Sequence, residues 1–430
     1  MFRTVKVLIF PCGAENAIEL HDALSCCVNV EVWGASSRDD HGRYVFRNYI
    51  GGLPYVEAHD FIAELNQVIH SHQIDVMFPT HDTVALHLAE SRDEIDCRIV
   101  MADNDTTRIC REKRRIYDLF ADCGFTPRVY KGLEEVEHYP VFLKPNVGEG
   151  GKHTALAKSR EEAEHILALE PDLLLVEHLP EEEYTVDCFT DRHGTLRFCG
   201  ARERTRIQYG ISVRANSVPL TDEIRTIAET INRRLKFRGL WFFQLKRASD
   251  RKLKLLEIST RTAGTMCLYR QQGVNLPLLS VYDAMDMDVA ILANDYSVEV
   301  DRALFGRYRL GLDYDAIYLD FDDTLVSRGE VNRFALLLLY QAAQQGKRVC
   351  LLTRHGGDIR AALATAKIDV GLFAEIRTLG WDEEKSRHIA PGEKAIFVDN
   401  SFAERKKVHE TLGLPVFDVD AVSALLDWRT

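Results

Sequence analysis

The sequence predicts a multidomain protein that combines α/β and α+β domains. Three observations carry this prediction. The chain has 430 residues, which is too long for one hydrophobic core. Its first and last quarters alternate apolar strands with helices, which is typical of doubly wound sheets. The stretch between these two regions is rich in strands.

The composition indicates a folded cytoplasmic protein. Apolar residues make up 46% of the chain, and the formal net charge of -12 argues against a nucleic-acid or membrane-surface partner. The ten cysteines are scattered and form no Cys-x-x-Cys pair, which is typical of reduced thiols in the cytoplasm. We expect neither a signal peptide nor a membrane span, since no apolar run is long enough.

The first predicted domain, residues 1–105, is an α/β domain with an open parallel sheet. A buried strand at Val5–Phe10 is followed by a turn and an amphipathic helix that ends at Leu24. Gly13 lies in that turn, but no Gly-x-Gly-x-x-Gly is present, so a plain tight turn is favoured over a dinucleotide site. The sequence predicts further strands at Val30–Trp33, Val76–Phe78 and Arg98–Met101.

The second predicted domain, residues 106–311, has two lobes, 106–180 and 181–311. Its first lobe opens with a helix around Lys113–Ala121. The predicted strands of the two lobes are Val141–Pro145, Leu173–Glu177, Tyr184–Phe189, Leu196–Ala201, Trp241–Lys246 and Lys254–Ile258. Residues 312–430 return to alternating strands and helices and form the third predicted domain.

A glycine-rich turn in the first lobe is suited to phosphate. Lys144 ends a strand just before a run with three glycines, Gly148, Gly150 and Gly151. Glycines let the backbone curl so that successive N–H groups point at phosphate oxygens. Lys144 adds a mobile positive charge, and Lys113 is a second candidate from the preceding helix.

Oxygen ligands for a divalent cation follow in the second lobe. Gln244 and Glu257 lie near the ends of successive strands, and a carboxamide beside a carboxylate suits Mg²⁺, with Mn²⁺ as an alternative. Arg261 comes shortly after Glu257 and would neutralise charge that builds up during phosphoryl transfer.

Taken in order, these pieces resemble the ATP-grasp superfamily, particularly its biotin-carboxylase and carbamoyl-phosphate-synthase-like branch. The resemblance covers about residues 1–305 and implies a Rossmann-like domain preceding a two-lobed ATP-grasp fold. It implies that Lys113 and Lys144 contact ATP phosphates beneath Gly148–Gly151, and that Gln244 and Glu257 hold magnesium. Arg261 would meet the transferred phosphoryl group. The implied adenine hinge is Glu177, His178 and Leu179, and Glu183 would hold the ribose.

One position departs from the family pattern. Ser259 stands where the family usually has an asparagine that binds the metal. The resemblance implies an ADP-forming ligase that activates a small-molecule carboxylate as an acyl phosphate for an amine or another nucleophile. Arginines at 202, 204, 206 and 214 either face the acceptor or form a solvated strand face. Pro79–Asp82 lies at a sheet edge where substrate often binds, and His81 is expected to be structural.

Two acids mark the start of the last domain. Asp320 and Asp322 follow the apolar run Ala316–Leu319, at the carboxyl end of a predicted strand. Phosphoryl transfer through an aspartyl-phosphate needs one carboxylate that attacks and a second that handles the proton of the leaving oxygen. The alternative is a buried acid pair that serves structure alone.

These acids resemble the first motif of the haloacid-dehalogenase superfamily. The resemblance makes Asp320 the nucleophile and Asp322 the general acid and base. Thr353 would hold a phosphoryl oxygen and Lys385, with Lys394 as a rival, would counter the phosphate charge. Asp399 would complete a magnesium shell with Asp320 and Asp322. The family usually has a second acid after this aspartate, but this sequence has Asn400 there, and Glu404 is the candidate that would supply the missing carboxylate.

Spacing also bears on the substrate. The intervals from Thr324 to Thr353 and from Thr353 to Lys385 are too short for a separate cap, which predicts a capless, open domain. Such a site either accepts a bulky phosphorylated metabolite or is covered by another surface, with the ATP-grasp half or a second subunit as the candidates. The domain pairing and the run Asp399–Arg405 also resemble the ATP-grasp proteins of tellurium-resistance gene clusters.

The leading hypothesis is a bifunctional enzyme, an ATP-dependent ligase joined to a magnesium-dependent phosphatase. A nucleotide-binding sensor without turnover is the alternative, motivated by Ser259 and Asn400. A carbamoyl-phosphate-type enzyme is the weakest of the three, because a single ATP-grasp unit is present without an amidotransferase domain. Related proteins are commonly dimers, so a homodimer is one possible assembly.

Overall fold

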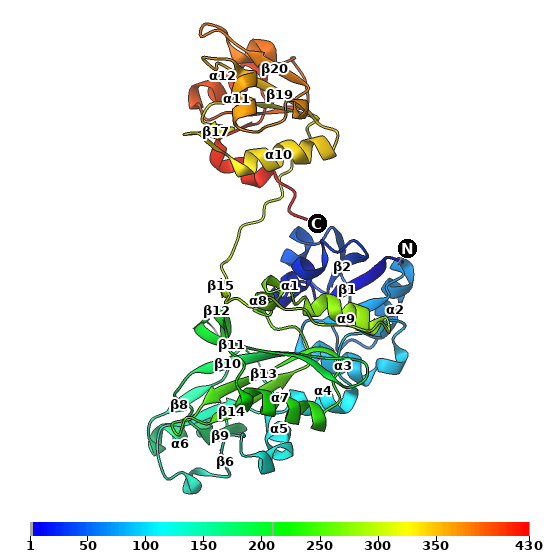
Figure 1. Cartoon of the computed structure of the whole chain (residues 1–430), viewed down its shortest axis with the longest axis vertical. Coiled ribbons are helices and arrows are strands. Elements are labelled where there is room, and N and C mark those ends of the chain that lie inside the picture. Colours follow the sequence, from blue (N-terminus) through cyan, green and yellow to red (C-terminus); the bar gives the residue numbers. More distant parts are fainter. Residues whose placement is uncertain (1–2, 149, 209, 430) are drawn as a thin grey trace. The chain divides into compact units, whose positions relative to one another are not determined.

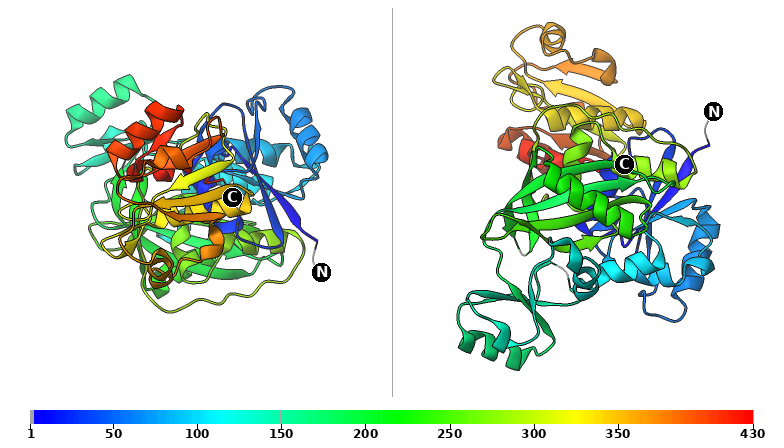
Figure 2. Two further views of the ribbon diagram at one scale, coloured as in Figure 1. Left: turned by 90° about the horizontal axis from the view of Figure 1, so that it is seen from above. Right: turned by 60° about the horizontal axis from the view of Figure 1, so that its bottom comes forward.

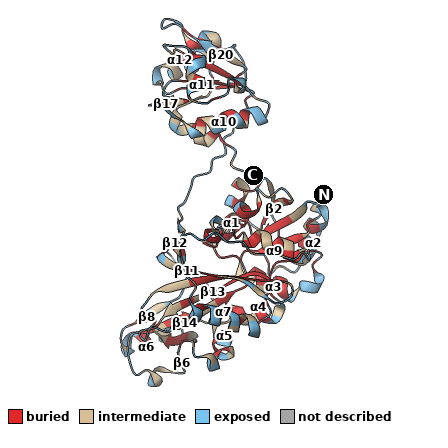
Figure 3. Cartoon of the chain, in the orientation of Figure 1, coloured by how far each residue is buried: buried red, intermediate tan, exposed pale blue. Residues whose placement is uncertain are grey.

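The computed structural model describes residues 3–148, 150–208 and 210–429. The chain forms two compact units, which we call unit 1, ending at Leu304, and unit 2, Phe305–Arg429. The division lies a few residues before the expected boundary between 311 and 312. Buried residues concentrate in the strands of each sheet and in the helix faces that cover them (Figure 3).

Unit 1 begins with a five-stranded parallel sheet in the order β3-β2-β1-β4-β5 (Figure 1). Its strands are β1 (Val5–Phe10), β2 (Val30–Ser36), β3 (Asn48–Gly51), β4 (Val76–Pro79) and β5 (Arg98–Ile99). The helices α1 (Glu15–Leu24), α2 (Phe61–His72) and α3 (Asp82–Glu90) connect them. This confirms the predicted parallel sheet, and it places α1 and α3 at the carboxyl edge, where open α/β sheets bind ligands.

The first lobe is a small antiparallel sheet in the order β6-β9-β7-β8. It comprises β6 (Val129–Tyr130), β7 (Val141–Pro145), β8 (Ala155–Ala157) and β9 (Leu173–Glu177), and α6 (Arg160–Leu169) packs on it. The lobe stands beside the larger sheet of unit 1 (Figure 2, right). The helices α4 (Asn104–Arg111) and α5 (Lys113–Leu119) precede it in the chain.

The second lobe is a six-stranded antiparallel sheet in the order β14-β13-β10-β11-β12-β15. The strands are β10 (Glu183–Thr190), β11 (Leu196–Gln208), β12 (Ile211–Val218), β13 (Gly239–Arg247), β14 (Leu253–Ser259) and β15 (Glu299–Asp301). β11 is thus longer than the predicted Leu196–Ala201, because it pairs with β12, which the sequence analysis did not identify. The helices α8 (Cys267–Gln271) and α9 (Leu276–Ala284) lie between β14 and β15 in the chain.

Helix α7 (Asp222–Arg234) explains which face of this sheet is free. Its apolar residues Ile224, Ile227 and Ile231 recur at helical spacing and pack with Phe243 of β13 in one core cluster. Because side chains alternate along a strand, Gln244 of β13 points to the opposite face. The cavities described below lie on that face.

Unit 2 is a separate α/β domain. Its parallel sheet has the order β20-β19-β16-β21-β22. The strands are β16 (Ala316–Leu319), β19 (Arg348–Thr353), β20 (Glu375–Thr378), β21 (Ala395–Val398) and β22 (Val416–Phe417), and a hairpin of β17 (Val326–Ser327) and β18 (Glu330–Val331) follows β16. The main helices are α10 (Arg333–Gln344), α11 (Ile359–Thr365) and α12 (Phe402–Leu412). Within residues 305–429, no connection between strands folds into a domain of its own.

Candidate functional site

Two adjoining cavities lie in unit 1. The smaller, of about 260 Å³, is called the hinge cavity because Glu177–Leu179 lines it; the larger, of about 440 Å³, is called the central cavity. The hinge cavity brings together residues that are far apart in the sequence: Lys113, Lys144, Gly148, Gly150, Gly151, Glu177, His178, Leu179, Glu183, Gln244 and Glu257. Several of these residues line both cavities, namely Lys113, Gly148, Gly150, Gln244 and Glu257.

Lys144 is a buried cation in the wall of the hinge cavity. Its ammonium nitrogen donates to the hydroxyl of Tyr117 at 2.5 Å, and that hydroxyl donates to the carbonyl of Leu256 at 2.8 Å. Burial, and then repulsion from Lys113, lowers the pKa of Lys144 to about 7 against the attraction of Glu257. An anion that entered the cavity would therefore raise the pKa of Lys144 and favour its protonated form.

The glycine turn lies close to the tip of the β11–β12 hairpin. Lys113 donates to the carbonyl of Gly148 at 3.3 Å, which ties α5 to the turn. Gly150, Gly151 and Gly210 all have positive φ, and a Cβ on Gly210 would lie 2.2 Å from the carbonyl carbon of Gly150. Only glycine permits this approach of two backbones. Glu149, within the predicted glycine run, is outside the described residues.

The hinge residues have protein partners. The carboxylate of Glu177 accepts from the main-chain N–H of Arg128 at 2.8 Å, which fixes the end of β9. Glu183 forms an ion pair with Arg204 and lies 3.5 Å from Lys246. Partial burial, and then the charge of Lys246, lowers the pKa of His178. His178 is therefore neutral at physiological pH.

Gln244 and Glu257 are directly opposed across β13 and β14. The side-chain oxygen of Gln244 accepts from Arg204 at 3.0 Å. The carboxylate of Glu257 has no hydrogen bond or ion pair with another described residue, although Glu257 lines both cavities. A carboxylate without a protein partner beside a carboxamide oxygen is a donor set that fits a hard divalent cation.

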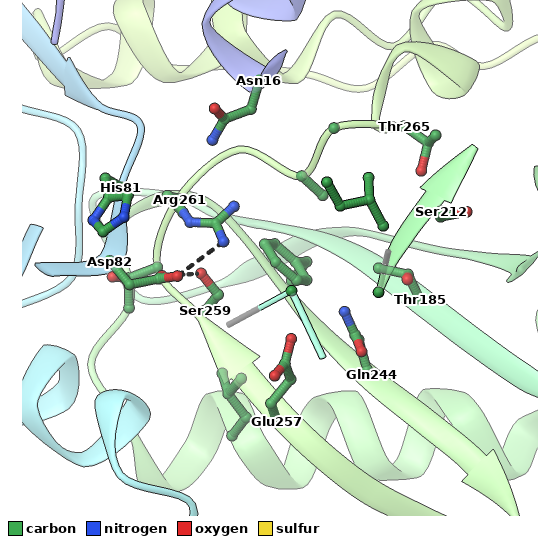
Figure 4. A pocket seen from close by; sticks show the side chains of 18 of the residues that line it. Asn16, His81, Asp82, Thr185, Ser212, Gln244, Glu257, Ser259, Arg261 and Thr265 are labelled. Atoms are coloured by element: carbon green, nitrogen blue, oxygen red, sulfur yellow. Dashed lines mark hydrogen bonds and ion pairs between the residues drawn. The ribbon is translucent and has the colours of Figure 1, made fainter. Parts of the chain in front are cut away.

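Asp82 of α3 reaches the end of β14. Its Oδ1 accepts from the Ser259 hydroxyl at 2.8 Å, and its Oδ2 accepts from Nη2 of Arg261 at 2.8 Å (Figure 4). Burial acts to raise the pKa of Asp82, but the charge and hydrogen bonds of Arg261 and Ser259 outweigh it and bring the value to about 2. Ser259 therefore contacts the first sheet of unit 1 through Asp82.

The four arginines of β11 and β12 divide into two pairs. Arg202 is buried and pairs with buried Asp187 through two hydrogen bonds, while Arg204 pairs with Glu183; both arginines line the central cavity. Arg206 and Arg214 both pair with Asp301 at about half exposure. Neither of the two sequence hypotheses describes all four, because the register shifts after Glu203 and the surroundings change along β11 from the buried Arg202 to the half-exposed Arg206.

Unit 2 gathers four predicted residues at the carboxyl edge of its sheet. The buried ammonium of Lys385 lies 2.6 Å from Asp399 Oδ2 and 2.9 Å from Asp320 Oδ1. Asp320 Oδ1 and the hydroxyl of Thr353 are buried and make no hydrogen bond within the described residues. Burial raises the pKa of Asp399, although Lys385 opposes the shift. Lys394, the rival of Lys385, instead pairs with Asp313.

The remaining predicted acids of unit 2 have other partners. Asp322 is exposed, and its Oδ2 lies 3.0 Å from Nδ1 of His355. Asn400 bonds with Thr324, and Glu404 forms an ion pair with Arg354. Glu404 is thus already neutralised by an arginine. Across the described part of the chain, no cluster of three or more His, Cys, Asp or Glu side chains forms a metal site by itself.

The sequence analysis did not predict Tyr117 or His355 as site residues, and it placed Asp82 at a sheet edge where substrate often binds without predicting its contacts. Tyr117 lies four residues after Lys113, which is one helical turn on the same face of α5, and His355 comes two residues after Thr353. Those spacings were available in the sequence. The contact of Asp82 with Ser259 spans 177 positions and had no local signal.

Unit 1 has the ATP-grasp fold. Three solved structures illustrate this likeness. Biotin carboxylase from Campylobacter jejuni has a TM-score of 0.55 at 13% identity, covering 66% of this chain and 72% of that protein. L-amino acid ligase from Bacillus licheniformis has a TM-score of 0.53 at 15% identity, and the match covers 66% of this chain and 75% of that protein. N5-carboxyaminoimidazole synthetase from Staphylococcus aureus, complexed with ADP, has a TM-score of 0.56 at 13% identity, and the match covers 67% of this chain and 79% of that protein.

A more particular family likeness lies within unit 1. Residues 169–303 match the family described as "ATP-grasp in the biosynthetic pathway with Ter operon". No curated protein matches the chain. None of these findings names a haloacid-dehalogenase fold for unit 2. Among the described residues, no helix combines the length and apolar character needed to cross a bilayer.

Proposed function

We propose that unit 1 is an ADP-forming, ATP-dependent ligase that joins a small-molecule carboxylate to an amine or another nucleophile. The observation that carries this proposal is that the two cavities share Lys113, Gln244 and Glu257 as lining residues. A nucleotide held at Glu177–Leu179 would extend its phosphates past Lys144 toward Arg261. The ATP-grasp fold and the family match over residues 169–303 support the same conclusion.

The proposed reaction has two steps. An oxygen of the acceptor carboxylate attacks the γ-phosphorus of ATP, and ADP leaves with the bond electrons. The nucleophile then attacks the acyl carbon, loses a proton and displaces inorganic phosphate. Lys144 and Arg261 would hold phosphate oxygens and offset the negative charge that grows on them. Gln244 and Glu257 would hold Mg²⁺ or Mn²⁺, which screens phosphate charge when bound.

A release assay tests the ligase proposal. The full chain is incubated with ATP, Mg²⁺ and pools of carboxylates and amines, and ADP and phosphate are measured. We expect release that depends on both pools and is abolished by Lys144→Ala. Lys158→Ala, which removes an exposed lysine of the same lobe, is the matched control and should retain activity.

Two other functions predict different outcomes. Tight ATP binding without turnover across broad pools would favour a nucleotide-binding sensor, for which the engagement of Ser259 by Asp82 is the supporting observation. Release driven by bicarbonate alone would favour a carbamoyl-phosphate-type activity.

We also propose that unit 2 is a capless, haloacid-dehalogenase-like, magnesium-dependent phosphatase. Support comes from Lys385 between Asp320 and Asp399, with the unpaired hydroxyl of Thr353 in the same group. Asp320 would attack the phosphorus while Asp322 protonates the leaving oxygen, and water would then cleave the aspartyl-phosphate. Carboxylate oxygens suit a hard cation, and Asp320, whose Oδ1 has only the ion pair with Lys385 among the described residues, would hold Mg²⁺ together with Asp322 and Asp399.

Hydrolysis of an aryl phosphate tests this second proposal. We expect Asp320→Asn to abolish magnesium-dependent release of p-nitrophenol from p-nitrophenyl phosphate while ATP-dependent ligation persists. Asp313→Asn is the control, since Asp313 is exposed and precedes the opposite end of the same strand. Lys144→Ala should leave this hydrolysis intact. Loss of both activities in either variant would contradict two separate sites.

A further inference from the structure

Glu257 and Ser259 alternate along the end of β14, so their side chains face the same side. Arg261 follows two residues after the strand and lines the same cavity. Figure 4 shows Glu257, Ser259 and Arg261 around the central cavity, and Asp82 approaches from a helix of the first sheet. The contact is therefore made in the cavity wall between two parts of unit 1 that are distant in sequence.

The geometry of Asp82 fixes the orientation of Arg261. One carboxylate oxygen accepts from Nη2 of Arg261 at 2.8 Å, and the other accepts from the hydroxyl of Ser259, also at 2.8 Å. Because both oxygens are engaged, the carboxylate cannot rotate without losing a hydrogen bond. Arg261 also donates through Nη1 to the carbonyl of Thr262 at 3.1 Å, and its guanidinium lies over the ring of Phe242.

The pair differs from the structural ion pair beside it. Arg202 and Asp187 also contribute to this region, but Asp187 is wholly buried and binds Arg202 through two parallel hydrogen bonds. The side chains of Asp82 and Arg261 remain 19% and 18% exposed, and both residues line the cavity. Arg202 also lines the cavity, but its side chain is only 1% exposed and that of Asp187 is fully buried, so the Asp82–Arg261 pair is the more accessible of the two to a ligand.

We infer that Asp82 is a positioning residue that holds Arg261 toward the terminal phosphoryl group of the nucleotide. The serine at 259, with a short hydroxyl in place of a carboxamide, leaves room for this carboxylate and orients it. The first sheet of unit 1 thereby contributes to discrimination between nucleoside triphosphate and diphosphate. This inference rests on the proposed ligase function, in which Arg261 meets that phosphoryl group.

Calorimetric titration of the full chain tests the inference without knowledge of the acceptor. The probes are the magnesium complexes of ADP and of the non-hydrolysable ATP analogue adenylyl imidodiphosphate. We expect Asp82→Asn to reduce the preference for the analogue over ADP by about tenfold or more, as expected for the loss of a charge-assisted hydrogen bond. ADP affinity should stay unchanged, because ADP lacks the group that Arg261 contacts.

Three further variants separate positioning from general stability. Asp82→Glu keeps the carboxylate and should recover part of the preference. Arg261→Lys should cause a similar loss, and the double variant with Asp82→Asn should lose little more, since the two residues act as one unit. Asp105→Asn removes an exposed acid in the first turn of the neighbouring helix α4 and should behave as the unaltered chain. Thermal unfolding midpoints verify that every variant is folded.

Opposite results would overturn the inference. One such result is an unchanged preference for the analogue over ADP in folded Asp82→Asn. A second is that the losses of preference in the two single variants multiply in the double variant. A third is a changed magnesium requirement while the preference stays intact. If the unaltered chain fails to bind the analogue, the proposed ligase function itself is wrong, and that outcome is distinct from the other three.

Discussion

The ammonium nitrogen of Lys144 lies 2.5 Å from the hydroxyl oxygen of Tyr117. The same hydroxyl donates to the main-chain carbonyl of Leu256, so a single oxygen joins α5, β7 and β14. The ammonium also lies 5.1 Å from the centroid of the Tyr117 ring. Tyr117 thus contacts the buried cation Lys144 through both its hydroxyl and its aromatic ring, and these contacts hold the ammonium in the wall of the hinge cavity.

Removing this hydroxyl should weaken both folding and nucleotide binding. Tyr117→Phe keeps the ring but leaves the Lys144 ammonium and the Leu256 carbonyl without their shared partner. We expect the free energy of unfolding to fall by about 1–3 kcal/mol, measured by urea denaturation, and the ATP-analogue affinity to fall severalfold. Tyr130→Phe, in the same lobe, should have little effect; equal losses in the two variants would contradict a specific role for Tyr117.

The lowered pKa of Lys144 predicts a pH dependence of stability. The folded chain without nucleotide releases this proton near pH 7, whereas the unfolded lysine keeps it until about pH 10.5. Between these values the unfolded state binds more protons, so the free energy of unfolding should rise with pH because of this group. Lys144→Met should remove that contribution.

Urea denaturation at pH 7 and pH 9 measures this effect. The increase in unfolding free energy from pH 7 to pH 9 should be larger in the unaltered chain than in Lys144→Met. An identical increase in both would show that Lys144 titrates at its ordinary pKa. The affinity for the ATP analogue should show the opposite trend and weaken above pH 7 in the unaltered chain, since the phosphates bind the protonated amine.

The approach of Gly210 to Gly150 predicts a specific effect of a single methyl group. Gly210→Ala would place a Cβ 2.2 Å from the carbonyl of Gly150, so the glycine turn and the β11–β12 hairpin must separate. We expect the affinity for the ATP analogue to fall about tenfold or more, the scale of one lost charged contact.

Gly194→Ala is the matched control for that experiment. Gly194 also has a positive φ, but a Cβ there would meet no atom within 4 Å. Both variants should lose about 1 kcal/mol of stability from backbone strain, and only Gly210→Ala should lose nucleotide affinity. Equal affinities in the two variants would show that the turn adjusts without cost to binding.

Loss of Lys385 should destabilise unit 2. Lys385→Met leaves the carboxylates of Asp320 and Asp399 facing each other without a cation, which costs about 3–5 kcal/mol for a buried pair. Hydrogen exchange should therefore speed up in β16 and β21, while exchange in the strands of unit 1 stays unchanged. Because burial already raises the pKa of Asp399, the destabilisation should shrink as the pH falls and the carboxylates take up protons. Equal exchange rates in β16 and β21 of the unaltered chain and of Lys385→Met would contradict this prediction.

The strands that carry the candidate site, and the order of their polar residues, could be predicted from local patterns in the sequence. Lys144 and Asp320 lie at the ends of β7 and β16, as predicted, and Glu257 lies two residues before the end of β14, because apolar runs and their polar boundaries are local signals. The prediction that Gln244 ends its strand was wrong, since β13 continues to Arg247. The parallel sheets also followed from alternating strands and helices. Local patterns fix these features since neighbouring residues set backbone conformation and side-chain alternation.

The partners of those side chains, in contrast, depend on long-range packing. Asp82 contacts Ser259 and Arg261, Asp322 turns to His355, and the backbone at Gly210 meets the turn at Gly150. Each contact joins segments that are remote in sequence, so its formation depends on how whole sheets and helices pack. A short stretch of sequence does not contain that information, because the position of its partner is set by every element folded between them.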